Sequence, residues 1–153
     1  RRSSILLGKV LGGSTIAVFE GMVILLFSFV VGVHLTIYST IMSILIMVLI
    51  STSLVSIGLV VSSLIESFEG FNTIMSFIIM PMFFLSGAVF PLDKIPGWMA
   101  PLVYINPLSY GVDALRTVIL GISYFPFSLD IILILLFSLA TMSLGVRAFK
   151  ARM

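Results

Sequence analysis

The chain has 153 residues, of which 60% are hydrophobic and only 9% are charged, and its net charge is +2. Soluble domains carry about 25% charged residues, so this composition, with a mean hydropathy of +1.31, excludes a soluble globular fold and intrinsic disorder. The sequence has no cysteine and a single histidine, His34. Disulfides, thiolate chemistry and histidine-rich metal or haem sites are therefore excluded. The small net charge gives no indication of a nucleic-acid partner.

Long runs without charge predict an all-α polytopic membrane protein, because a spanning helix needs roughly 20 apolar residues. Residues 1–13 hold a short apolar stretch among basic residues and are too charged to span. We expect a tight turn after the first span and a loop at Glu66 and Glu69 before the third. The four predicted transmembrane helices are residues 14–34, 40–65, 71–92 and 127–146, and residues 147–153 form a tail.

The stretch of residues 93–121 is apolar but interrupted by prolines. Pro96, Pro101 and Pro107 exclude one continuous helix, since proline lacks the backbone N–H and clashes with the preceding turn. Asn106 followed by Pro107 is typical of a helix start and predicts a helix that runs to about Leu120. Two short re-entrant helices, which enter the membrane and return, fit this pattern better than a fifth span.

The distribution of basic residues predicts the topology. Six of the eight Lys and Arg residues lie within the first nine or the last seven positions. Because cytoplasmic segments are enriched in Lys and Arg, both ends of the chain are expected in the cytoplasm. An even number of spans follows, and the proline-rich hairpin of residues 93–121 is then extracellular.

Motifs of common catalytic sites are missing. Gly8-Lys9 lacks the remaining residues of a phosphate-binding loop, and Gly12-Gly13-Ser14 lacks the last glycine of a hydrolase nucleophile elbow. With no cysteine and one histidine, most intramembrane hydrolase sites cannot be built. Two kinds of protein remain, a transport subunit and a noncatalytic membrane assembly or maturation factor.

The block of residues 83–121 contains several short elements in a fixed order. It resembles the C-terminal signature of type-2 ABC exporter permeases, especially the drug-efflux branch typified by daunorubicin-resistance permeases. The elements are Ser86-Gly87, Phe90-Pro91, Pro96-Gly97-Trp98, Asn106-Pro107-Leu108, Tyr110 and Asp113-Ala114-Leu115-Arg116. The segment of residues 1–13 is also similar to the intracellular loop before the third helix of that family.

The resemblance implies a function. A complete subunit of the family has six spans, and this chain would supply the last four. Two permease subunits, as a homodimer or heterodimer, would form the substrate path in the cell membrane. ATP-Mg would bind a partner ABC ATPase, so this chain would hold no cofactor and would not itself be an enzyme. Drug or lipid-like substrates are favoured by the drug-efflux resemblance.

Beside the signature elements named above, two groups of residues are candidates for this function. The segment that would dock on the ATPase contributes Arg2, Ile5, Leu6, Leu7 and Lys9. The candidate substrate path contains Glu20, Phe77, Met80 and Phe84, because an intramembrane carboxylate is costly and aromatic and methionine side chains form adaptable apolar walls.

The residues of the candidate substrate path also have a structural interpretation. Glu20 could extend to the interface or bond a neighbouring helix, and the three apolar residues could face lipid or pack. Asp113 and Arg116 lie three apart on one helix face. They are expected to form either a partly buried pair that holds the re-entrant helix or a solvated pair at the outer surface.

Overall fold

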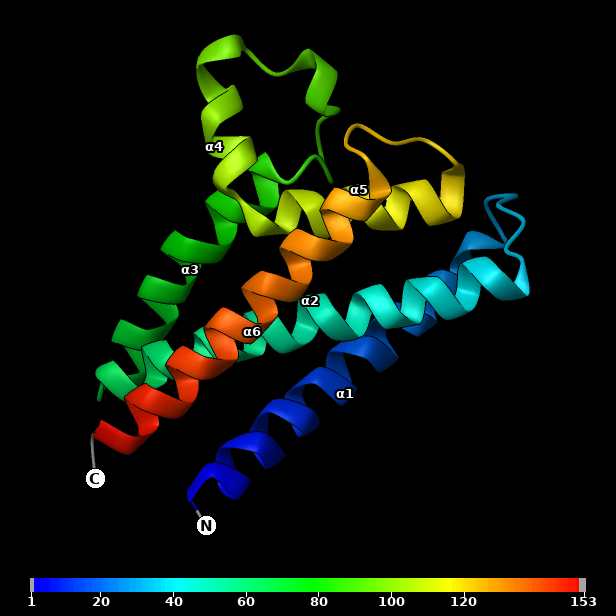
Figure 1. Cartoon of the computed structure of the whole chain (residues 1–153). Helices are drawn as coiled ribbons and strands as arrows, with labels where there is room; N and C mark the ends of the chain where they lie inside the picture. Colours follow the sequence, from blue (N-terminus) through cyan, green and yellow to red (C-terminus); the bar gives the residue numbers. More distant parts are fainter. Residues whose placement is uncertain (1, 152–153) are drawn as a thin grey trace.

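A computed structural model describes residues 2–151, without the side chains at positions 2, 3, 6 and 149–151. Within that part all the regular secondary structure is helical, which confirms the predicted all-α class (Figure 1). Four helices are long and apolar enough to cross a membrane. The elements are α1 (Arg2–Ser28), α2 (Ile37–Leu64), α3 (Phe68–Leu85), the 3-10 turns Leu92–Lys94 and Gly97–Met99, α4 (Ala100–Ile105), α5 (Pro107–Leu120) and α6 (Phe127–Ala151).

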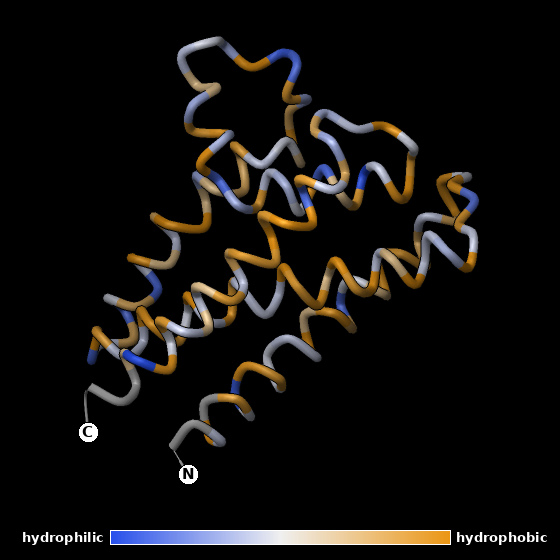
Figure 2. Tube along the Cα trace, viewed as in Figure 1, coloured by the Kyte–Doolittle hydropathy of each residue, from blue (hydrophilic) through white to orange (hydrophobic). Residues whose placement is uncertain are grey.

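Helix α2 is the centre of the bundle. It packs against α1, α5 and α6, whereas α3 makes few contacts with the rest of the chain. The first turn of α1 and the last turn of α6 lie at the same end of the bundle, and α4 and α5 lie at the opposite end (Figure 1). Hydrophobic residues dominate along the four long helices, and the most hydrophilic positions gather at their ends and connections (Figure 2). This arrangement agrees with an even number of spans.

The buried face of α2 is built largely from serine. Five of its seven buried residues are Ser39, Ser43, Ser51, Ser53 and Ser56. Most of these hydroxyls donate to carbonyls three or four residues earlier, such as Ser53 Oγ to Leu49 at 2.8 Å and Ser56 Oγ to Thr52 at 2.7 Å. Small side chains whose hydroxyl groups are satisfied within their own helix allow membrane helices to approach closely.

Glycines of α1 serve the same purpose at the α1–α2 contact. A Cβ atom at Gly21 would lie 2.8 Å from Met47 Sδ, and one at Gly13 would lie 3.0 Å from Val55 Cγ1. Both glycines therefore leave room for side chains of α2. Small residues thus occupy both sides of this contact.

The first helix differs from the predicted segments at both of its ends. It continues without a break from Arg2 to Ser28, so residues 1–13 are not separated from the first span. Its span-length apolar part is Leu7–Ser28. The helix ends before residue 34 because a turn follows, in which Gly32 adopts φ 85°, a left-handed conformation that glycine reaches without strain.

The following helices also begin and end at different residues from those predicted. Helix α2 begins at Ile37, where Thr36 and Ser39 form a capping box. Helix α3 begins at Phe68 because the Ser67 hydroxyl caps it, which places Glu69 in its first turn and not in a loop. It ends at Leu85 and not at residue 92.

The C-terminal helix is longer than predicted, because α6 extends from Phe127 to Ala151 and includes residues 147–151 of the predicted tail. The predicted helix from Pro107 to Leu120 is confirmed with both of its ends. The sidedness of the membrane segments stays a prediction.

Candidate functional site

The polar face of α5 is bonded to the end of α3. Asn106 Nδ2 donates to the Met82 carbonyl at 2.7 Å, and Ser109 Oγ donates to the Leu85 carbonyl at 3.2 Å. About two turns further along α5 than Ser109, the Arg116 guanidinium donates to the Gly87 carbonyl. The last carbonyls of a helix have no partner within it, so these three side chains supply donors where α3 stops.

Gly87 is shaped for this contact. It adopts φ 82°, and a Cβ atom there would lie 2.8 Å from Leu92 Cγ. The left-handed turn directs its carbonyl to Arg116, and the absence of a side chain lets Leu92 pack closely. Asn106 has a second role, because its Oδ1 accepts from the Leu108 N–H at 3.1 Å and caps α5.

Asp113 holds the connection between α5 and α6. Its carboxylate accepts the Tyr124 N–H at 2.9 and 3.0 Å and the Phe125 N–H at 2.8 Å, and the residue is 1% exposed. The expected pair with Arg116 is not present, since the two side chains, both described, bind different backbone groups. Sequence spacing placed them on one face, but each bonds a segment that is distant in sequence. The two residues therefore fasten α5 to its neighbours separately.

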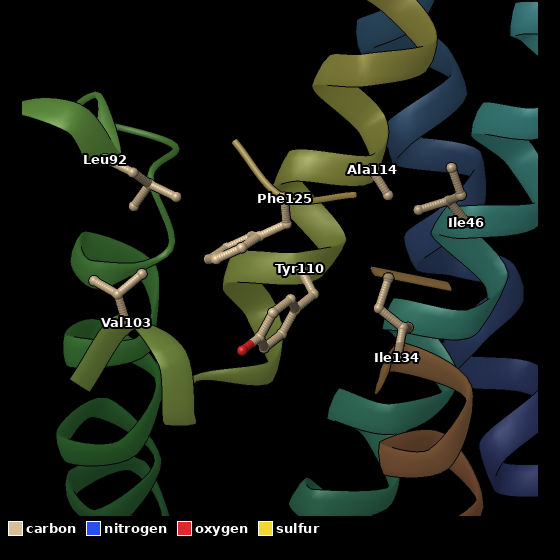
Figure 3. Close-up of a cluster of buried hydrophobic side chains, with 7 residues drawn as sticks. All are labelled: Ile46, Leu92, Val103, Tyr110, Ala114, Phe125 and Ile134. Atoms are coloured by element: carbon tan, nitrogen blue, oxygen red, sulfur yellow. The ribbon is translucent and has the colours of Figure 1, made fainter. Parts of the chain in front are cut away.

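An aromatic cluster lies between α4, α5 and the start of α6. The Tyr110 hydroxyl donates to the Tyr104 carbonyl at 2.7 Å, and its ring lies 4.9 Å from the Phe125 ring. Burial, followed by the nearby Asp130 and Tyr104, raises the pKa of Tyr110 above its usual 10, so the hydroxyl stays protonated and able to donate. Tyr110 and Phe125 belong to a continuous buried cluster with Ile46 of α2 and Ile134 of α6 (Figure 3).

The remaining signature residues shape the segment before α4. Pro91 and Pro96 immediately precede the two 3-10 turns, where a fixed φ favours the start of a helical turn. Gly97 opens the second turn, and Trp98 is 74% exposed. The signature therefore divides into a bonded half on α5 and an exposed half before α4.

The apolar candidates for the substrate path share one exposed surface. Phe77, Met80 and Phe84 are 77%, 61% and 45% exposed, and none of the α3 residues, all of them described, is buried. Phe84 also lines a hollow of about 540 Å³ between the end of α3 and the segment before α4. Glu20, on α1, is exposed and lies apart from this surface, so the structure does not bring the four predicted path residues together.

The candidate docking residues lie on the first turns of α1. Ile5, Leu7 and Lys9 are exposed there, as a docking surface requires. The side chains of Arg2 and Leu6 lie outside the described residues. The predicted apolar cluster is thus continuous with the first span-length helix.

Two buried polar groups were not among the predicted candidates. Asp130 in the first turn of α6 is 0% exposed, and neither of its oxygens has a hydrogen-bond donor; the buried Ser43 Oγ also lacks a partner. Ser109 was missed as well, although it lies on the same face of α5 as Asp113 and Arg116. The signal for Asp130 was its position as the single charge at the start of an apolar helix, but its burial arises only when other segments, α5 among them, pack against α6.

Replacing Asp113 tests the connection that it holds. We expect Asp113→Asn to lower the stability of the protein by about 1–3 kcal/mol, because the amide turns an N–H donor toward backbone donors and leaves one of them unsatisfied. Thermal unfolding of the full-length protein in nanodiscs measures this, and amide exchange should increase at Tyr124 and Phe125. The exposed Asp93→Asn is the matched control; equal melting of the two variants would contradict the assigned role.

Replacing Asp130 tests whether its buried carboxylate lacks a hydrogen-bond donor or a charged partner. We expect Asp130→Asn to raise the stability, on the order of 1–3 kcal/mol, because the charge is removed and the shape is kept. The exposed Glu20→Gln should leave the melting temperature unchanged. A melting temperature of Asp130→Asn below that of the unmodified protein would show that the carboxylate has a partner that these residues do not supply.

The chain is similar to a nodulation protein and to a probable multidrug ABC transporter permease. Over 66 residues it is 39% identical to Nodulation protein J of Rhizobium meliloti, which covers 43% of this chain and 25% of that protein. Over 74 residues it is 34% identical to the probable multidrug ABC transporter permease YbhR of Escherichia coli, covering 48% of this chain and 20% of that protein. The matched part is thus a fifth to a quarter of the length of these relatives. No solved structure matches the chain.

The family comparison covers most of the chain. Residues 1–120 match the model of the family described as ABC-2 type transporter, so the match includes α1 to α5 and every named element of the signature. Among the residues that carried the resemblance, Asn106 and Arg116 bond α5 to the chain at the end of α3, and Asp113 bonds it to the α5–α6 connection. The chain belongs to the ABC-2 type transporter family.

Proposed function

We propose that this chain forms the membrane-spanning part of an ABC exporter permease and contributes to a substrate path driven by ATP hydrolysis on a separate cassette subunit. Membership of the ABC-2 type transporter family is the observation that carries the proposal. Four span-length helices and a compact helical segment at one end of them support it. The complete assembly would contain two permease subunits, identical or different, and an ATPase that binds ATP-Mg.

The contacts of the bundle support a mechanical link between the N-terminal turns of α1 and helix α3. Helix α1 has 27 residues and is thus about 40 Å long at roughly 1.5 Å per residue. If α1 moves as a rigid body, a displacement of its N-terminal turns would also move α2, because α1 packs closely against α2 at Gly13 and Gly21. Helix α2 packs against α5 and α6, and α5 is bonded to the end of α3. Closure of an ATPase against residues 1–13 could therefore move α3.

The surface of α3 supports an apolar substrate. Phe77, Met80 and Phe84 present aromatic rings and a flexible thioether, which adapt to ligands of different shape. We propose drug-like or lipid-like molecules as the substrates. A relative named as a probable multidrug permease favours the same class.

The docking role is tested by charge substitution on α1. We expect Ile5→Asp or Leu7→Asp in the full-length protein to abolish co-purification of the cassette ATPase and to reduce transport at least tenfold, because a carboxylate cannot enter an apolar groove without a large desolvation cost. Insertion into the membrane should be unchanged. The matched control is Ile16→Asn, an exposed position further along the same helix.

The same experiment separates the proposal from a noncatalytic assembly or maturation factor. A permease recruits an ATPase and stimulates its hydrolysis in proteoliposomes, whereas an assembly factor does not. Failure of the unmodified full-length protein to recruit any ATPase would refute the exporter proposal. Normal ATPase recruitment and transport in Ile5→Asp and Leu7→Asp would refute only the docking role.

The proposed orientation places both ends of the chain in the cytoplasm and the segment of residues 93–121 outside the cell. The chain has no cysteine, so single cysteines can report accessibility. We expect Asp93→Cys to react with a membrane-impermeant maleimide on intact cells, and Glu66→Cys to react only after permeabilisation. The reverse pattern would overturn the orientation.

A further inference from the structure

A groove runs along α3 and ends beneath the two 3-10 turns. Its upper part has a volume of about 540 Å³ and lies between Phe84 of α3 and the residues Pro91, Lys94 and Met99. A second hollow of about 370 Å³ continues along α3 past Met80 and Phe77 and shares Phe84 with the first. Each volume falls within the roughly 300–1,000 Å³ of small-molecule sites, and the two together form an elongated, open groove.

The groove is apolar along its length and carries one charge, at its end. Lys94 is the only charged residue that lines either hollow. The preceding carboxylate, Asp93, lines a different hollow on the other side of the 3-10 turn, next to Tyr104 and Tyr124. The Lys94 ammonium forms no ion pair with any described residue. One cationic side chain without an ion-pair partner among the described residues therefore lies at the end of an apolar groove.

We propose that this groove binds an anionic amphiphile, with its aliphatic chain along α3 and its anionic head group on the Lys94 ammonium. The chain would lie against Phe77, Met80 and Phe84, which cover about 10 Å of helix at roughly 1.5 Å per residue. Burial of the aliphatic chain supplies the affinity, and the cation selects the head group. Either a resident bilayer lipid or a transported molecule can provide this chemistry.

The geometry also explains why the head group lies at this end. The groove begins on the exposed surface of a span-length helix and ends where the chain leaves that helix for a segment with polar and charged positions. An amphiphile lying alongside α3 would thus keep its chain beside the apolar helix surface and its head near the helix end. The binding needs no ATPase, so it is independent of the proposed transport function.

The test is photolabelling of the full-length protein in nanodiscs of phosphatidylcholine. The probe is palmitate with a photoreactive diazirine on its chain, and labelled positions are read by peptide mass spectrometry. We expect labels on residues 77–99 that unlabelled palmitate competes away. Lys94→Gln should reduce this labelling about threefold to fivefold, as loss of a partly exposed ion pair allows, whereas Lys94→Arg and Asp93→Asn should retain it.

Two further measurements keep the result interpretable. Photoreactive hexadecanol, which has no charge, should label the unmodified protein and Lys94→Gln equally. Met80→Trp, which narrows the groove on an exposed helix face, should reduce labelling by both probes. Equal palmitate labelling of Lys94→Gln and the unmodified protein, or labels spread evenly over α1, α2 and α6, would overturn the proposal.

The source of the amphiphile is decided by adding the cassette ATPase and ATP. Release of bound palmitate during ATP turnover identifies a transported molecule and supports the proposal. Retention of bound palmitate during ATP turnover, together with labelling by photoreactive phosphatidylglycerol as strong as that by palmitate, identifies a resident lipid. This result also supports the proposed groove. Absence of ATPase recruitment would refute the exporter function and leave the labelling result unaffected.

Discussion

The structure depends on satisfying the backbone carbonyls where α3 stops. In an apolar environment water is not available to bond the free carbonyls of a helix end, and each unsatisfied group costs several kcal/mol. Asn106, Ser109 and Arg116 supply these donors from one face of α5. Helix α3 has no buried residue of its own and makes few contacts with α2 and α5, so these side-chain hydrogen bonds are a large part of what positions its end.

The same face of α5 also sets the direction in which the chain returns. Asp113 accepts three backbone hydrogen bonds from the connection that leads to α6. The carboxylate thus fixes the start of α6 relative to α5, and the aromatic cluster around Tyr110 and Phe125 fills the space beneath. One short helix therefore orients two long ones. This explains in physical terms why Asn106, Tyr110, Asp113 and Arg116 follow one another at intervals of three or four positions.

Helix α3 packs sparsely against the rest of the chain, whereas α1, α2 and α6 pack closely, and their residues explain the difference. Helices α1, α2 and α6 approach closely because serine and glycine occupy their contacts, and such contacts are stable without large apolar burial. Helix α3 instead presents large aromatic and methionine side chains outward. Its surface is suited to ligands, lipid or another helix more than to packing within this chain. The groove ending at Lys94 exists because these α3 side chains are not covered by other helices of the chain.

The all-α class, the four span-length helices and the helix of residues 107–120 could be read from the residues alone. Hydropathy, proline positions and the Asn106-Pro107 cap are local properties, and local properties are sufficient for such predictions. The predicted ends of the other helices were less accurate, because a left-handed glycine at position 32 and serine caps determine where those helices begin and end. The partners of Asp113 and Arg116 could not be read from their spacing. Tyr124, Gly87 and the burial of Asp130 depend on which segments meet, and long-range contacts between side chains and distant backbone groups arise only when the helices pack.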